Sequence, residues 1–210
     1  MIHELRTYTL ARGTGGVREL ERRFGNNLEV RLKYSKLGGF FHTEIGEDST
    51  QVVHLWPYAG YQDRAEAREA ANHDDSGRWP PGIAELFARQ QVEILLPAPF
   101  MRPLEPRQLG RIWELSWLDF PVGGVLPALD ALAGALPQRE QLYPLVGCWT
   151  VEVGTVTNRI YLLAPYRDWQ HRDEVMAALR TDPAWPPQFS TAAIGSGAKI
   201  LLPARFSPLK

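Results

Sequence analysis

The sequence predicts an α+β fold: two tandem ferredoxin-like (βαββαβ) domains forming an eight-stranded barrel within one chain. Three observations lead to this prediction. The 210 residues are 44% apolar and 22% charged, as in ordinary globular proteins. The two halves of the chain match each other in order along most of their length. Each half also carries the pattern of a βαββαβ unit, and the bare face of one such sheet needs a second layer.

The internal repeat sets the predicted domain boundaries. Glu4 recurs as Glu114, and the second copy is shorter by two residues at two places, both in expected loops. We therefore predict a domain over residues 1–98, a proline-containing linker over 99–110, and a divergent second domain over 111–205. Other matched segments are Gly15–Val17 with Gly123–Val125, Pro57-Tyr58 with Pro165-Tyr166, Arg64 with Arg172, Trp79–Pro81 with Trp185–Pro187, and Ile94–Ala98 with Ile200–Ala204.

Periodicity predicts the elements of the first domain. Apolar and polar residues alternate over residues 2–8, which indicates a half-buried strand. Apolar residues then recur every three or four positions over 17–32, which predicts a helix, and Gly38 is its expected stop. The remaining predictions are strands over 40–45 and 51–56 joined by a turn, a helix over 61–71, a short helix over 83–90 and a closing strand over 92–96.

Three segments of the first domain resemble the NIPSNAP family: Ile2–Tyr8 (IHELRTY), Val52–Tyr58 (VVHLWPY), and the helix that carries Arg64 and Arg68. The resemblance extends more weakly through the second domain. It implies a member of the dimeric α+β barrel superfamily, here with two fused domains, and a molecular activity that is poorly defined within the family. Other branches of that superfamily are cofactor-free monooxygenases and haem-dependent proteins, but a shared fold does not transfer their chemistry.

The two copies differ in their polar residues, which favours a binding site in the first domain. Residues needed only for the fold would be expected in both copies. The alternative is that the second domain repacked after duplication, since cores tolerate apolar exchange at constant volume. Where the first copy has Arg6, Tyr8, His54, Trp56 and Arg68, the second has Ser116, Leu118, Leu162, Ala164 and Met176. The predicted ligand-binding residues are Arg6, Tyr8, His54, Trp56, Arg64 and Arg68.

His54 is the candidate catalytic residue. Strand alternation places it on the same side as Trp56 and Tyr58. An imidazole there could act as a general base or as an axial haem ligand, and the alternative is a hydrogen-bonded core histidine. Arg64 and Arg68 lie four residues apart on one helical face, where they could clamp a carboxylate or phosphate, or form surface ion pairs with neighbouring glutamates.

Residues kept in both copies are interpreted as architectural. Glu4 and Glu114 on the first strands could pair with Arg64 and Arg172 on the second helices and fix each helix on its sheet. Cys148, the single cysteine, lies in an apolar strand, where a thiol usually behaves as a small buried hydrophobe. We predict no cofactor and no metal site, because no residues have a metal-ligand spacing.

Charge and hydropathy exclude two classes of partner. A formal net charge of -1 provides no positive field to hold a phosphate backbone, so we expect no nucleic acid. No run approaches the ~20 apolar residues of a membrane helix, so we expect no membrane. The charged opening Ile2–Arg6 is unlike a signal peptide core, and a single cysteine suits a reducing compartment, which together predict a cytoplasmic location. The oligomeric state is predicted to be a monomer or homodimer.

The function that these features favour is the binding of a small molecule, with or without catalysis, in a pocket of the first domain between the sheet and the second helix. A non-catalytic interaction platform is the first alternative, and it predicts a filled pocket. A cofactor-free monooxygenase-like or haem-binding protein is the second alternative.

Overall fold

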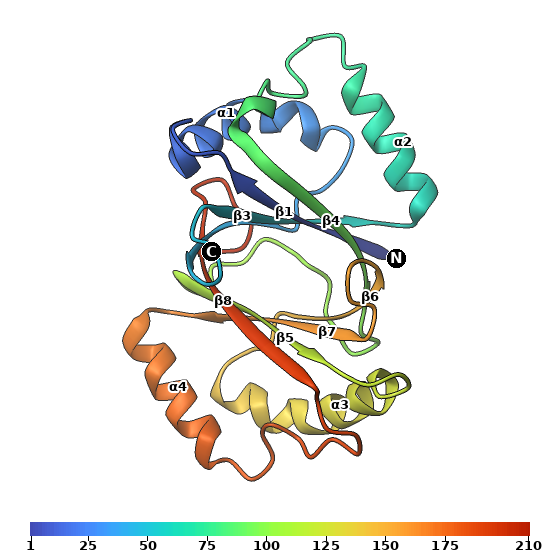
Figure 1. The fold of residues 1–210 in the computed structure, drawn as a ribbon, viewed down its shortest axis with the longest axis vertical. Helices are drawn as coiled ribbons and strands as arrows, with labels where there is room; N and C mark the ends of the chain where they lie inside the picture. The colour runs from blue at the N-terminus through green and yellow to red at the C-terminus, as the bar shows by residue number, and fades with distance from the viewer.

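Eight strands form a closed barrel in the order β1-β3-β2-β8-β5-β7-β6-β4. The computed structural model describes residues 1–210, and two βαββαβ units follow each other along the chain (Figure 1). The predicted α+β barrel within one chain is confirmed. The elements are β1 (Ile2–Leu10), α1 (Gly16–Leu32), β2 (Gly39–Ile45), β3 (Gln51–Tyr58), α2 (Tyr61–Asn72), η1 (Ala84–Leu86), β4 (Phe87–Pro97), β5 (Ile112–Asp119), α3 (Val125–Leu142), β6 (Gly147–Val153), β7 (Arg159–Tyr166), α4 (Trp169–Thr181) and β8 (Gly195–Pro203).

The two units, here named the first repeat (β1 to β4 with α1 and α2) and the second repeat (β5 to β8 with α3 and α4), share two seams. Strand β2 pairs with β8, and β4 pairs with β6, both antiparallel. Each repeat therefore covers the edge strands of the other, which removes the open edges of two separate sheets.

The barrel interior is filled with side chains. Strand alternation turns Leu5 of β1 inward, where it joins one cluster with Phe41 and the fully buried indoles of Trp113 and Trp149. Leu104, between the two repeats, packs against the same cluster. Residues of both repeats fill this space, so the surfaces available for a binding site are the outer faces of the sheets.

Helices cover those outer faces, with α1 and α2 over the first repeat and α3 and α4 over the second (Figure 1). The apolar stripe predicted for the first helix is present, since Leu20, Phe24 and Leu28 are buried in one cluster with Phe40 and Trp56. None of the helices combines the length and hydropathy needed to cross a membrane.

The short helix predicted over residues 83–90 is wrong. Only Ala84–Leu86 form one turn of 3-10 helix, and from Phe87 the chain belongs to β4. Strand β1 needs a hydrogen-bonding partner along its whole length, and Gln90 pairs there with Tyr8.

The stop predicted at Gly38 is also wrong, because α1 ends earlier, at Leu32. Gly38 is needed for close packing instead: an added Cβ would come within 2.9 Å of Leu104 and 3.2 Å of the Leu55 carbonyl oxygen.

Candidate functional site

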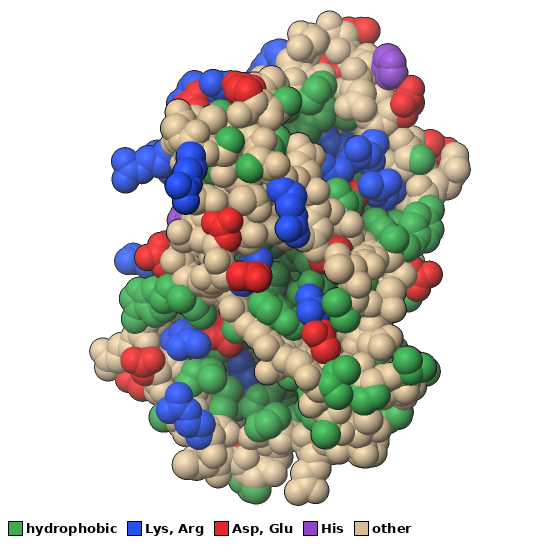
Figure 2. Space-filling model, in the orientation of Figure 1, with side chains coloured by type: hydrophobic (Ala, Val, Ile, Leu, Met, Phe, Trp, Pro, Cys, Tyr) green, Lys and Arg blue, Asp and Glu red, His purple; other side chains and the backbone are tan.

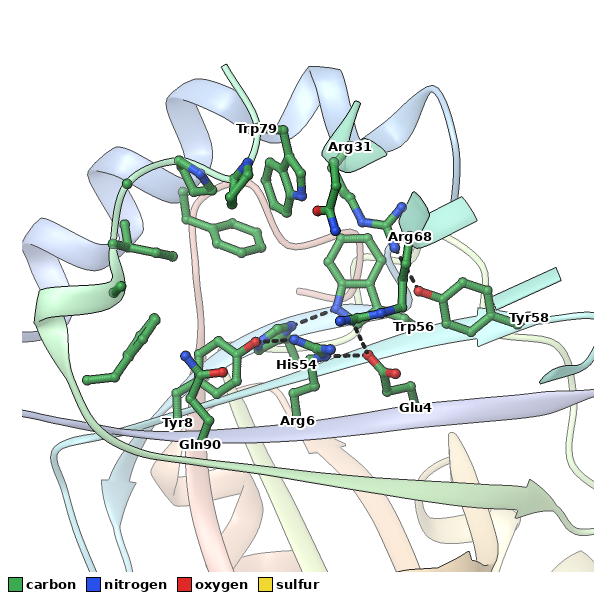
Figure 3. Close-up of a pocket in the computed structure, with 18 residues that line it drawn as sticks. Glu4, Arg6, Tyr8, Arg31, His54, Trp56, Tyr58, Arg68, Trp79 and Gln90 are labelled. Atoms are coloured by element: carbon green, nitrogen blue, oxygen red, sulfur yellow. Dashed lines mark hydrogen bonds and ion pairs between the residues drawn. The ribbon is translucent and has the colours of Figure 1, made fainter. Parts of the chain in front are cut away.

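A cavity of about 250 Å³, here named the first cavity, lies on the outer face of the first repeat. It separates β1 and β3 from α1, α2 and the loop before β4 (Figure 3). The residues around it are Glu4, Arg6, Tyr8, Phe24, Arg31, His54, Trp56, Tyr58, Arg68, Asn72, Trp79, Pro80, Pro81, Gly82, Ile83, Ala84, Phe87 and Gln90. Five of the six predicted ligand-binding residues therefore meet here.

Strand alternation explains how the sheet residues come together. In β1, the even-numbered Glu4, Arg6 and Tyr8 face outward, and the antiparallel register sets Arg6 opposite His54 and Glu4 opposite Trp56. The predicted shared side of His54 and Trp56 is confirmed, because both line the first cavity.

Glu4 is the anionic centre of this site. Its side chain is 1% exposed, and the Nε atoms of Arg6 and Arg64 each donate a hydrogen bond to its carboxylate. Arg68 Nη1 lies farther away, 3.7 Å from Oε1. Burial by itself would raise the pKa of Glu4, but Arg6 and Arg64 outweigh it and hold the pKa below its usual value. The carboxylate is therefore ionised and already satisfied by two cations.

Arg64 is the predicted residue that the structure does not bring to the cavity. Its guanidinium holds Glu4 instead, so the predicted architectural pair on the second helix is confirmed. The surface-pair alternative does not describe Arg64 and Arg68, because the neighbouring glutamates have other partners: Glu66 accepts from Gln62, and Glu69 contacts His73.

Arg31, on α1, was missed by the sequence reasoning. Its side chain is buried, Nη2 donates to the Tyr58 hydroxyl at 2.8 Å, and Nη1 donates to the Ala67 carbonyl at 3.1 Å. The guanidinium carbon lies 5.0 Å from the centre of the Trp56 ring. Burial lowers the pKa of Arg31, and no carboxylate lies within ion-pair distance. The signal that could have found it is its match to Arg139 in the second copy.

His54 is held as a neutral hydrogen-bond donor. Its Nδ1 accepts from the indole N–H of Trp56 at 2.7 Å, and an indole can only donate, so the imidazole proton is on Nε2. Burial first, and Arg6 second, lower its pKa well below 6.5. Nε2 is buried and has no partner within the protein. The side chain thus presents an N–H, with no free lone pair.

These contacts do not fit two roles considered for His54. A general base or an axial haem ligand needs an imidazole lone pair, and the lone pair of Nδ1 is already taken by Trp56. Moving the proton to Nδ1 would set two N–H groups against each other. Of the two sequence interpretations, the hydrogen-bonded core histidine describes this geometry.

Aromatic rings form the apolar walls of the first cavity. The ring centres of Tyr8 and Phe87 are 4.6 Å apart, and those of Phe24 and Trp79 are 5.3 Å apart. Arg68, whose side chain is 39% exposed, lines the same cavity and has only the long contact to Glu4. A planar molecule with a charged end would meet both kinds of group.

Two other reactive side chains lie away from the site. Cys148 is buried, and burial raises the pKa of its thiol to about 12. The side chain therefore behaves as a small hydrophobe and not as a nucleophile. His3 points into the barrel, accepts at Nδ1 from Trp149 at 2.9 Å, and has its pKa lowered to about 4 by burial. No three His, Cys, Asp or Glu side chains are grouped in a way that could hold a metal ion.

Comparison with known proteins first identifies the class of protein, which is an α+β barrel. A putative monooxygenase from Lactobacillus acidophilus has the same fold, with a TM-score of 0.66 over 96% of this chain and 92% of its own, at 11% identity. The NIPSNAP family model matches residues 3–102 and 115–208. Human NipSnap homolog 3B is 30% identical over 99% of this chain and 85% of its own length, and its mouse counterpart is 29% identical over similar spans. The chain belongs to the NIPSNAP family.

Proposed function

We propose that this protein binds a small aromatic carboxylate in the first cavity. The observation that carries the proposal is the charge of the lining: three arginines, Arg6, Arg31 and Arg68, face one glutamate that Arg6 and Arg64 already satisfy. An anion entering this cavity would find positive charge without having to displace Glu4.

The proposed ligand has its acid group near Arg68 and its ring among the aromatic walls. Arg68 has unused guanidinium N–H groups, and His54 Nε2–H is a buried donor without a partner. An unpaired buried donor is unfavourable, so a ligand oxygen that reaches it contributes affinity. A cavity of about 250 Å³ suits a molecule of roughly one ring with a short acid chain, because about 150 Å³ holds benzene.

Binding without catalysis by His54 is the form of function that the contacts favour. His54 offers a donor and no base, so its role is to hold an oxygen of the ligand. An open cavity also argues against a purely structural platform, since that alternative expects the space to be filled.

Calorimetric titration with phenylacetate tests the proposal. We expect saturable binding to the wild-type protein and about 10- to 100-fold weaker binding to Arg68→Met, because a hydrogen bond between charged groups is lost. The substitution copies the second repeat, where Met176 stands at this position. The uncharged phenylacetamide should bind weakly to both proteins.

Met176→Leu is the matched control, because it alters the equivalent position of the other repeat and should leave phenylacetate binding unchanged. The proposal fails if neither phenylacetate nor benzoate binds at millimolar concentration, or if Arg68→Met binds phenylacetate as well as the wild type does.

A further inference from the structure

The second repeat has a cavity of its own, which we name the second cavity. It has a volume of about 220 Å³ and lies at the position equivalent to the first cavity, between β5 and β7 on one side and α3, α4 and the Trp185 loop on the other. The residues around it are Glu114, Ser116, Arg139, Leu145, Leu162, Ala164, Tyr166, Met176, Leu179, Arg180, Trp185 and Pro186.

The walls of the second cavity are aliphatic where those of the first are aromatic or charged. Leu162, Ala164 and Met176 replace His54, Trp56 and Arg68 of the first repeat. The space-filling view shows the contrast: basic side chains gather beside α2, whereas hydrophobic side chains surround the hollow beside α4 (Figure 2). Because Ala164 stands where the first repeat has the indole of Trp56, this space stays open for a flexible, apolar ligand.

One buried cation remains in this apolar setting. Arg139 is 2% exposed, lines the second cavity and donates from Nη1 to the Tyr143 carbonyl. No carboxylate lies within ion-pair distance of it, because Glu114 is held by Arg172 through contacts of 2.7 and 2.9 Å. Burial lowers the pKa of Arg139, which reflects the cost of keeping this charge from water.

A buried guanidinium without an anion lies here against an aliphatic cavity. This combination matches a ligand that has one acid group and an apolar chain. A carboxylate would supply the anion that Arg139 lacks, and the attached hydrocarbon would fill the space against Leu162, Met176 and Leu179. We propose that the second cavity is a separate binding site for aliphatic monocarboxylates, with Arg139 as the residue that binds the acid group. This site does not depend on the function proposed for the first cavity.

The three methionines of the chain make the test specific. Met176 lines the second cavity, whereas Met1 is exposed and Met101 belongs to the linker and packs against the cluster inside the barrel. In protein labelled with 13C at the methionine methyl groups, titration with octanoate should shift the Met176 signal to saturation and leave the other two unchanged. Met176→Leu assigns the signal. Phenylacetate, directed at the first cavity, should not move it.

Two variants test where the acid group and the hydrocarbon chain of octanoate bind. Ala164→Trp introduces the indole that Trp56 has in the first repeat and should abolish the octanoate-dependent shift by filling the cavity. Arg139→Lys should raise the Kd for octanoate at least about tenfold, since a lysine loses the two-pronged contact with a carboxylate. Arg68→Met should leave octanoate binding unchanged.

Three results would overturn the proposal: no saturable Met176 shift with millimolar octanoate, an equal affinity for the uncharged 1-octanol, or an unchanged shift in Ala164→Trp. Each variant is first checked for cooperative thermal unfolding. Should Arg139→Lys fail to fold, the comparison of octanoate with 1-octanol in the wild-type protein decides the role of the charge.

Discussion

Glu4 and Glu114 occupy the same strand position in the two repeats, but their surroundings differ. Glu4 is 1% exposed and binds Arg6 and Arg64, with Arg68 close by, whereas Glu114 is 13% exposed and binds Arg172 alone. The ion pair between first strand and second helix is common to both copies, so it belongs to the fold. The additional arginines of the first repeat therefore belong to its cavity.

The largest expected difference between the repeats comes from removing these two carboxylates. Glu4→Gln leaves two tightly held arginines without their anion, and breaking a buried pair in this way typically costs about 3–5 kcal/mol. Glu114→Gln removes a less buried, single partner and should cost about 1–3 kcal/mol. Urea unfolding at neutral pH measures both. Equal losses would show that the extra arginines of the first repeat do not depend on Glu4.

His54 makes the stability of the first repeat depend on pH at a position where the second repeat has Leu162, which cannot titrate. The pKa of His54 is near 6.5 in the unfolded chain and is depressed in the folded protein, so below pH 6.5 the unfolded state binds a proton that the folded state does not. The free energy of unfolding should therefore fall as the pH falls from 6.5, by up to about 1.4 kcal/mol per pH unit from this residue.

Urea unfolding between pH 7 and 5 tests this sign. His54→Gln should reduce the pH slope relative to the wild type, and His3, whose pKa is lowered to about 4, should account for part of what remains. The matched control is His73→Gln, which makes the same substitution at a side chain that is 73% exposed. A wild-type slope retained in His54→Gln would contradict a buried neutral imidazole.

The features of this molecule that depend on spacing could be predicted from the sequence. Alternation and the internal repeat led to the barrel, and five polar positions unique to the first copy do line one cavity. Strand and helix periods place each of these side chains on a known face, and matching the copies removes positions that serve only the fold.

Properties that depend on how deeply a side chain is buried, or on which of several partners it binds, could not be predicted from the sequence. Arg31 lies on the buried face of α1, and apart from its match to Arg139 in the second copy nothing in the sequence distinguishes it from a surface arginine. Arg64 and Arg68 share a helix face, yet only one of them reaches Glu4 closely, which three-dimensional distances decide. The donor role of His54 follows from a single contact with Trp56.

The smallest expected effect concerns stability at the position where Arg68 faces Met176. Burial, and then repulsion by Arg6, lower the pKa of Arg68, and its only carboxylate neighbour is already bound by two other arginines. A binding residue held in this way destabilises the ligand-free protein. Arg68→Met should therefore raise the free energy of unfolding by about 0.5–1 kcal/mol, while it weakens phenylacetate binding.

The reciprocal change should have the opposite sign. Met176→Arg would add a second cation beside the buried Arg139, with Glu114 already bound to Arg172, and should lower the free energy of unfolding by about 1 kcal/mol. Unfolding in low and high salt separates charge from packing, because 1 M salt screens partly exposed charges and should shrink both effects. If Arg68→Met instead destabilised the protein in either salt, Arg68 would have to be counted with Arg64 as part of the fold, and the contrast between the two cavities would lose its functional meaning.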